Sequence, residues 1–280
     1  MNRMDSATAT AGSGLKPEHF PEAAADTRPG LWFEVHPENY MVAGGPRLAW
    51  LEAMRSRHPL SLHGVGLSLA GMAPPDEAHL ARLKALADRF DPFLISEHLA
   101  WCVHAGSYAP DLLPFPRTLA ALDRIAGHID RVQTVLKRPI LIENPSLYMH
   151  LRGHEMSETD MLTALCTRTG CGLLIDVNNV HVSASNLGFD ARQWLDAIPT
   201  AMIGEIHLAG HAADAQRPLL IDTHGASVAE AVWSLYDHLV ARIGPRPTLI
   251  ERDDDIPPYA ELMAERDRAH NVLTREPCHA

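Results

Sequence analysis

Short apolar runs in this chain repeatedly end in a carboxylate or an imidazole. The clearest is PILIENP at 139–145, in which Glu143 follows three aliphatic residues. Ionisable or amide groups end eight such runs: Glu34 and His36; His63; Glu97 and His98; Glu143; Asp176 with Asn178 and Asn179; Glu205 and His207; Asp222 and His224; and Glu251. Because many carboxylates buried together need cations to pair them, this pattern predicts a metal site.

Each of these groups also has a structural explanation. A carboxylate after a strand can cap the next helix, and a histidine can donate a hydrogen bond to a backbone carbonyl. Eight separate coincidences are a poorer explanation than one shared site. The spacing supports this, because Glu205 with His207, and Asp222 with His224, stand two residues apart and so point to the same side of a strand.

The types of ligand restrict the metal. Imidazole and carboxylate without thiolate suit Fe, Mn or Zn, whereas all-oxygen Mg or Ca sites and cysteine-based Zn or Fe–S sites fit poorly. About nine candidate ligands exceed what one ion needs, so we expect two or three ions bridged by a carboxylate. Glu143 is the candidate bridge, with Pro145 stiffening the loop behind it. The residues leave a redox metal and a Lewis-acid metal equally open.

Eight expected strands alternate with amphipathic helices, which favours a closed (β/α)8 TIM barrel. The strands are expected at 31–35, 60–63, 93–97, 140–143, 172–176, 202–207, 219–222 and 248–251. The seventh follows the sixth too closely for an ordinary crossover helix. An open doubly wound sheet is the alternative, but its glycine-rich phosphate turn is missing. In a barrel the strand-end groups would meet at the C-terminal face, where barrel enzymes do their chemistry.

Two segments stand outside this alternation. Residues 1–14 are small and polar without periodicity, so we expect a disordered tail followed by a single barrel domain at 15–280. The segment 99–116 contains three prolines and is expected to be a long loop that forms a wall or lid of a binding cleft.

Composition excludes several classes of partner. The 280 residues are 46% hydrophobic and carry a formal net charge of −11, which argues against binding to nucleic acid or to an anionic membrane. No apolar run could span a bilayer and the start has no signal-peptide core, so we expect a cytoplasmic protein. The four cysteines do not form a metal or disulfide pattern and are expected to be reduced structural thiols.

Eight motifs in order resemble the DUF692 (UPF0276) family of multinuclear non-heme iron-dependent oxidases, which includes the methanobactin and bufferin biosynthesis oxidases. They are WFEVHPENYM (32–41), SLHGVGLSL (61–69), SEHLAW (96–101), LIENPS (141–146), TGCGLLIDVNNV (169–180), GEIHLAGH (204–211), LLIDTH (219–224) and LIERDDDIP (249–257). The likeness implies a xylose-isomerase-like barrel with two or three irons in mixed Fe(II)/Fe(III) states. It also implies O2 as cosubstrate, a ribosomally made precursor peptide as substrate, and a partner protein that recognises the peptide.

The resemblance also assigns residues, motif by motif. The implied metal ligands are His63, His98, Glu143, Asp176, Asn179, His207, Asp222, His224 and Glu251, with His181 as the alternative to Asn179. Glu34, His36, Asn39 and His211 are the catalytic candidates, which would contact substrate or orient a ligating imidazole. The family usually has an aromatic residue where this chain has Arg252, and we expect that difference to alter the pocket wall.

The leading hypothesis is therefore an iron-dependent oxidase that binds a substrate thiolate and O2 and removes a hydrogen next to the sulfur. A thiolate suits iron because soft sulfur binds the metal and loses its proton to it. One alternative is a divalent-metal isomerase or hydrolase on the same barrel, with the metals as Lewis acids. Another is a non-catalytic metal-binding protein.

Overall fold

Eight parallel strands close into a barrel in the computed structural model, which describes residues 10–104 and 107–275. The barrel strands are β1 (Ala11–Gly14), β2 (Phe33–Val35), β3 (Leu60–Gly64), β4 (Leu94–His98), β7 (Leu141–Glu143), β8 (Gly172–Asp176), β9 (Ile203–Leu208) and β12 (Thr248–Ile250). β1 pairs with both β2 and β12 and so closes the ring. The predicted (β/α)8 TIM barrel is confirmed.

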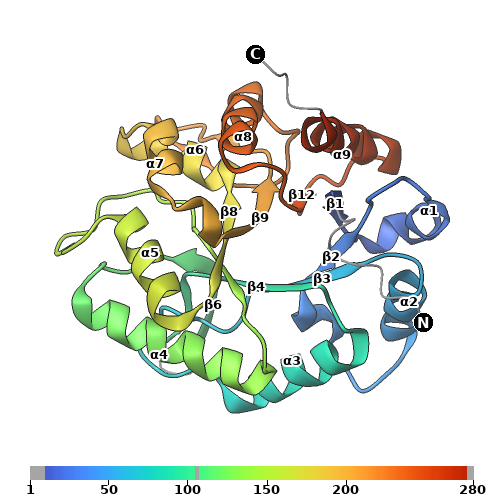
Figure 1. Cartoon of the computed structure of the whole chain (residues 1–280), viewed down its shortest axis with the longest axis horizontal. Helices are drawn as coiled ribbons and strands as arrows, with labels where there is room; N and C mark the ends of the chain where they lie inside the picture. The colour runs from blue at the N-terminus through green and yellow to red at the C-terminus, as the bar shows by residue number, and fades with distance from the viewer. Residues whose placement is uncertain (1–9, 105–106, 276–280) are drawn as a thin grey trace.

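Helices surround the barrel on all sides (Figure 1). They are α1 (Phe20–Ala25), α2 (Pro46–Arg55), α3 (Glu77–Phe90), α4 (Leu119–Leu136), α5 (Glu158–Thr169), α6 (Val177–Leu187), α7 (Ala191–Ala197), α8 (Glu230–Ile243) and α9 (Tyr259–Thr274), with 3-10 turns at Pro17–His19, Pro37–Tyr40 and Thr200–Met202. Two of these helices have side-chain caps, since the Thr118 and Ser157 hydroxyls accept hydrogen bonds from the backbone N–H groups of Ala121 and Asp160. None of the helices in the described ranges is long and apolar enough to cross a membrane.

The strand β1 corrects the expected disordered tail. Residues 11–14 lie inside the barrel, where Ala11 and Ser13 are fully buried, whereas residues 1–9 lie outside the described ranges. The sequence AGSG contains no apolar run, so hydrophobic patterning misses it. Small residues are required because a Cβ on Gly12 would come within 2.4 Å of the Trp32 ring.

The expected strand 219–222 is also corrected. Its centre is β11 (Leu220–Ile221), which pairs antiparallel with β10 (Ala212–Ala213) outside the barrel. The two strands form a short excursion between β9 and α8. The count of eight barrel strands is therefore right, but one member was predicted in the wrong place.

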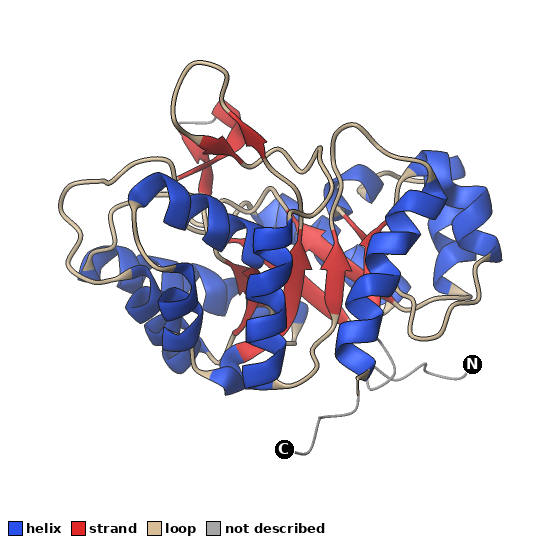
Figure 2. Cartoon of the chain, turned by 90° about the horizontal axis from the view of Figure 1, so that it is seen from above, coloured by secondary structure: helices blue, strands red, loops and turns tan. Residues whose placement is uncertain are grey.

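The expected long loop at 99–116 is largely a β-hairpin. Its strands are β5 (Trp101–His104) and β6 (Ser107–Leu113), which pair antiparallel and project beyond the barrel (Figure 2). The Trp101 indole N–H donates to the Pro114 carbonyl at 2.7 Å, which ties the hairpin base together. Three of the cysteines, Cys102, Cys166 and Cys171, are buried free thiols, and Cys278 lies outside the described residues.

Alanine at two glycines should test the role of β1. Gly12→Ala should lower the free energy of unfolding by about 1–3 kcal/mol, because the new methyl overlaps Trp32. Gly127→Ala, on the exposed side of α4 with nothing within 4 Å, should raise it by about 0.5–1 kcal/mol. Urea unfolding midpoints measure both changes, and a Gly12→Ala protein as stable as wild type would contradict the position of β1.

Candidate metal centre

Strand register brings the predicted ligands to one end of the barrel. His98 on β4 stands beside Glu143 on β7, and Asp176 on β8 stands beside His207 on β9. All four lie at or near the carboxyl ends of their strands. Because neighbouring parallel strands run in the same direction, these ends share one face of the barrel, as the sequence predicted.

A first cluster consists of His63, His98 and Glu143. The Nε2 atoms of both histidines lie 3.1 Å from Glu143 Oε2 and 3.2 Å from each other. The Ser96 hydroxyl lies 2.8 Å from His63 Nδ1, which fixes the ring so that Nε2 faces the cluster. One metal ion fits between the three side chains, since their ligand atoms lie within 4.8 Å of one another.

A second cluster shares Glu143 with the first. It adds Asp176, His207 and Glu251, with all four side chains buried and their ligand atoms within 4.8 Å of one another. His207 Nδ1 lies 3.1 Å from Glu251 Oε2 and 3.9 Å from Glu143 Oε1. Glu143 therefore presents one oxygen to each cluster, which is the arrangement of a bridging carboxylate.

Asp222 and His224 lie beside the second cluster despite the misplaced strand. The loop after β11 turns back over the barrel, with His224 at a positive φ of 50°, so that its Nδ1 is 3.5 Å from Glu251 Oε2. Its Nε2 is 2.7 Å from Asp222 Oδ1. A hydrogen-bonded chain extends outward from this pair, because Asn178 donates to Asp222 and lies 2.7 Å from His211 Nδ1.

Asn179 and His181 differ in their surroundings. Asn179 is buried on α6, its Nδ2 donates to the Asn144 carbonyl, and its Oδ1 has no hydrogen-bond partner within residues 10–104 and 107–275. His181 is half-buried and its ring lies 4.9 Å from that of His211. The free, buried amide oxygen makes Asn179 the better candidate ligand of the two.

Glu34 and Glu205 contact the far side of the His207 ring. Their Oε1 atoms lie 3.3 Å and 3.8 Å from His207 Nε2, while Nδ1 faces the second cluster. A carboxylate that accepts from one ring nitrogen leaves the other free to bind a metal. Glu34 thus lies where the sequence predicts an imidazole-orienting group, and Glu205 occupies an equivalent position that the sequence does not predict.

His36 and Asn39 lie at the rim of the centre, where His36 contacts a residue that the sequence did not indicate, Asp253. His36 Nε2 is 3.8 Å from Asp253 Oδ1, the same oxygen that accepts from Lys16 at 2.7 Å. The other Asp253 oxygen is 3.3 Å from His224 Nδ1. Asp253 follows Glu251 by two residues, so the same-side spacing that linked Glu205 to His207 could have identified it.

Burial and neighbouring charges set the pKa values in the centre. Burial opposes the charged form of His63, but the Glu143 and Glu34 carboxylates outweigh it and raise the pKa of His63 to about 10. Burial likewise opposes ionisation of Glu143, but His98 and His63 outweigh it and lower its pKa to about 2. Burial and then the Glu143 charge raise the pKa of Asp176 well above its usual range. His63 and Asp176 therefore hold their protons more tightly than usual. Those protons offset carboxylate charge that bound metal cations would otherwise neutralise.

Unsatisfied atoms in the clusters fit bound cations. Buried oxygens without a hydrogen-bond partner in the described ranges include Asp176 Oδ2, Glu143 Oε2, Glu34 Oε2 and both oxygens of Glu205. Buried polar atoms are normally paired, so several unpaired carboxylate oxygens in one place suggest missing partners. The mixture of imidazole and carboxylate suits iron, manganese or zinc.

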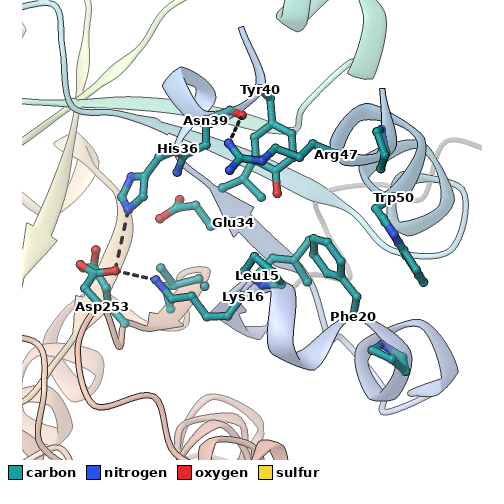
Figure 3. A pocket seen from close by; sticks show the side chains of 17 residues that line it. Leu15, Lys16, Phe20, Glu34, His36, Asn39, Tyr40, Arg47, Trp50 and Asp253 are labelled. Carbon is teal, nitrogen blue, oxygen red and sulfur yellow. Dashed lines mark hydrogen bonds and ion pairs between the residues drawn. The ribbon is translucent and has the colours of Figure 1, made fainter. Parts of the chain in front are cut away.

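Two cavities open onto the centre. One of about 350 Å³ lies over His98, Asp222, His224 and Glu251, and is partly walled by Asp111 and Leu112 of β6. The other, of about 550 Å³, extends from Glu34 and Glu251 towards α1 and α2 (Figure 3). His36, Asn39, Glu251 and Asp253 line both. The segment 99–116 thus contributes to a cleft wall, as expected.

Arg252 does not alter either cavity wall. Its side chain is buried and donates to Glu265 of α9 at 2.9 Å, and it lines neither of the two cavities. The prediction that Arg252 forms part of the pocket wall is therefore wrong. The residue after Glu251 points away from the site because successive side chains in an extended segment alternate between its two sides.

The chain is thus a TIM barrel with a cluster of candidate metal ligands at one end of its strands. Among solved structures, 3-keto-D-glucoside 4-epimerase YcjR from E. coli superposes with a TM-score of 0.58 at 14% identity, covering 95% of this chain and 100% of that one. Endonuclease IV from Thermus thermophilus gives 0.56 at 15% identity, covering 94% and 98%. These likenesses show the fold.

Sequence comparison is more specific than the structural comparison, because it identifies the family of the chain. Residues 10–274 match the family described as RiPP precursor modification enzyme MbnB/TglH/ChrH, which acts on ribosomally made peptide precursors. A UPF0276 protein of Caulobacter vibrioides is 66% identical over 278 residues, covering 97% of this chain and 99% of that protein. A UPF0276 protein of Bordetella bronchiseptica is 52% identical over 271 residues, covering 95% and 93%. The chain belongs to the MbnB/TglH/ChrH family of RiPP precursor modification enzymes, and the resemblance to UPF0276 is confirmed.

Proposed function

We propose that this protein is a multinuclear non-heme iron-dependent oxidase that uses O2 to modify cysteine, or another residue, of a ribosomally synthesised precursor peptide. The observation that carries the proposal is the position of Glu143, whose two oxygens face two adjacent buried ligand clusters. Membership of a family of precursor-modifying enzymes supports a peptide as the substrate. We further propose a cytoplasmic location and a partner protein that presents the peptide.

Three groups of residues would hold the metal. His63, His98 and Glu143 would bind one iron, and Glu143, Asp176, His207 and Glu251 a second. Asp222 and His224 would supply further ligands beside the second cluster, and Asn179 is the remaining candidate ligand. Iron bound there supplies a site for a substrate thiolate and O2, and the redox capacity to move electrons from the carbon next to sulfur to O2.

The surrounding residues orient the ligands and control protons. The carboxylates of Glu34 and Glu205 lie 3.3 Å and 3.8 Å from His207 Nε2, so their negative charge favours a proton on that nitrogen and would leave Nδ1 for the metal. Asp253 holds His36, His224 and Lys16 around the entrance. His211, supported by Asn178, is placed to exchange a proton with solvent near Asp222. The burial of the clusters keeps bulk water away from the reacting groups.

Metal analysis and anaerobic turnover test this function. Protein purified in air should contain at least two irons per chain, with Mössbauer spectra of coupled high-spin iron, and a matched precursor peptide should be modified only when O2 is supplied. Product formed without O2 would contradict the oxidase. Activity restored fully by Zn, Mg or Mn without O2 uptake would favour the alternative, a Lewis-acid isomerase or hydrolase. Iron whose redox state never responds to the peptide would indicate a non-catalytic metal protein.

A further inference from the structure

The larger cavity has an aromatic wall that the metal chemistry does not use. Phe20 and Trp50 stack with ring centroids 5.3 Å apart and an interplanar angle of 25°, and Tyr40 lines the same side. We call these three residues the aromatic wall. Trp50 is 42% exposed, whereas Phe20 and Tyr40 are buried. Because the exposed indole of Trp50 continues a buried aromatic surface, binding of an apolar group that covers it would be energetically favourable.

The polar groups of this cavity suit an amide backbone. Glu34 is 4% exposed and lines the inner end of the cavity (Figure 3), and its Oε2 has no hydrogen-bond partner in the described part of the chain. The negative charge of this carboxylate favours a donor group, such as a bound N–H, at that end of the cavity. On the opposite side, Arg47 donates one hydrogen bond to the Asn39 carbonyl, and no carboxylate of the described ranges lies within 4 Å of its guanidinium. It retains donors for a bound carbonyl oxygen.

The cavity is continuous with the candidate metal centre. Its inner end is formed by Glu34, His36, Glu251 and Asp253, of which the last three also line the cavity over the clusters. A chain that places one side chain at the clusters can therefore place a neighbouring side chain on the aromatic wall. Three carboxylates at the inner end disfavour a phosphorylated or otherwise anionic group there.

We propose that the aromatic wall is a specificity pocket for a bulky apolar residue, aromatic or leucine-like, that neighbours the modified residue of the peptide. This inference rests on the proposed function for the identity of the substrate. The volume of about 550 Å³ is in the range of a ligand pocket and accommodates a large side chain together with its backbone. Glu34 and Arg47 bind the adjacent backbone amides.

Equilibrium dialysis of the full chain in anaerobic buffer tests the pocket. The probes are acetyl-Gly-Gly-Phe-Cys-Gly-Gly-amide and acetyl-Gly-Gly-Cys-Phe-Gly-Gly-amide, each compared with the same peptide carrying Ala for Phe. We expect at least fivefold tighter binding of the Phe peptide in one of the two orders. Trp50→Ala should abolish this preference. Leu119→Ala, which removes a similarly exposed side chain from α4 away from both cavities, should preserve it.

Four results would overturn the proposal. They are equal binding of Phe and Ala peptides in both orders, a preference that survives Trp50→Ala, displacement of the peptide by D-fructose, and a change of sedimentation coefficient in Trp50→Ala. The third would assign the wall to a sugar and the fourth to a second copy of the chain.

The design separates this pocket from the oxidase chemistry. Because dialysis measures binding without turnover, a Phe preference that persists with Ser in place of Cys supports the pocket even if O2 is never consumed. Conversely, O2 consumption with Phe and Ala peptides that bind equally would overturn the pocket and leave the oxidase standing.

Discussion

Glu143→Gln should remove at least one iron from the protein and leave the barrel folded. The substitution keeps the shape of the side chain but removes the negative charge that faces His63, His98 and His207. Loss of an outer partner of a metal site costs roughly 10- to 100-fold in affinity, and loss of a shared ligand should cost at least as much. Iron content per chain measures the effect, and circular dichroism verifies the fold.

Glu97→Gln is the matched control. Glu97 is buried on β4, one residue before His98, and its Oε1 accepts from the Leu67 N–H rather than facing a cluster. Burial and then the Glu38 charge raise the pKa of Glu97 well above its usual range, so its neutral acid form already resembles glutamine. Iron content should therefore stay at the wild-type value. If both variants lost iron equally, a specific role of Glu143 would be contradicted.

Removal of the metals should make stability fall steeply as pH rises from 6.5 to 10. The pKa of His63 is raised to about 10, and the pKa values of His207 and His224 are raised well above normal by neighbouring carboxylates that outweigh burial. Such histidines stabilise the folded state fully below about pH 6.5, and the contribution is lost as pH rises towards their folded values. Burial and then the Glu34 charge raise the pKa of Glu205 to about 7. Stability therefore also falls as the pH rises from about 4 to 7.

Thermal melts of chelated and iron-loaded protein measure this difference. The chelated form should lose roughly 5 °C or more in Tm between pH 6.5 and 9, equivalent to about 2 kcal/mol for a chain of this size. The iron-loaded form should change less, because bound cations replace the protons. Below about pH 4.5 the sign reverses, since Glu143 has its pKa lowered to about 2 and loses its contribution on protonation. Parallel pH profiles for the two forms would contradict a metal centre at these residues.

Sequence patterning located most of the barrel but not its first strand. The other seven barrel strands contain apolar runs such as LLI before Asp176, and the pattern is strong because parallel barrel strands are buried on both faces. β1 consists of small residues because Trp32 crosses it closely, so it carries no hydrophobic signal. The run at 219–222 carries that signal without being a barrel strand, because local sequence does not specify which strand it pairs with.

The candidate ligands lie close together even where the strand that precedes them is assigned wrongly from sequence. Asp222 and His224 reach the second cluster although β11 lies outside the barrel, because the loop after it returns to the same face. Lys16 could not be found from sequence, since its role comes from contact with Asp253, which lies 237 residues away along the chain. Contacts of that kind depend on barrel closure and leave no local pattern.

The strand that closes the barrel also borders the larger cavity. β1 is held by three residue pairs to β12 and two to β2, whereas the residues that follow it, Leu15 and Lys16, form a wall of the larger cavity. The candidate metal ligands lie on or after other strands. Hydrogen exchange at residues 11–16 should therefore respond to a ligand bound in the larger cavity more strongly than to metal content.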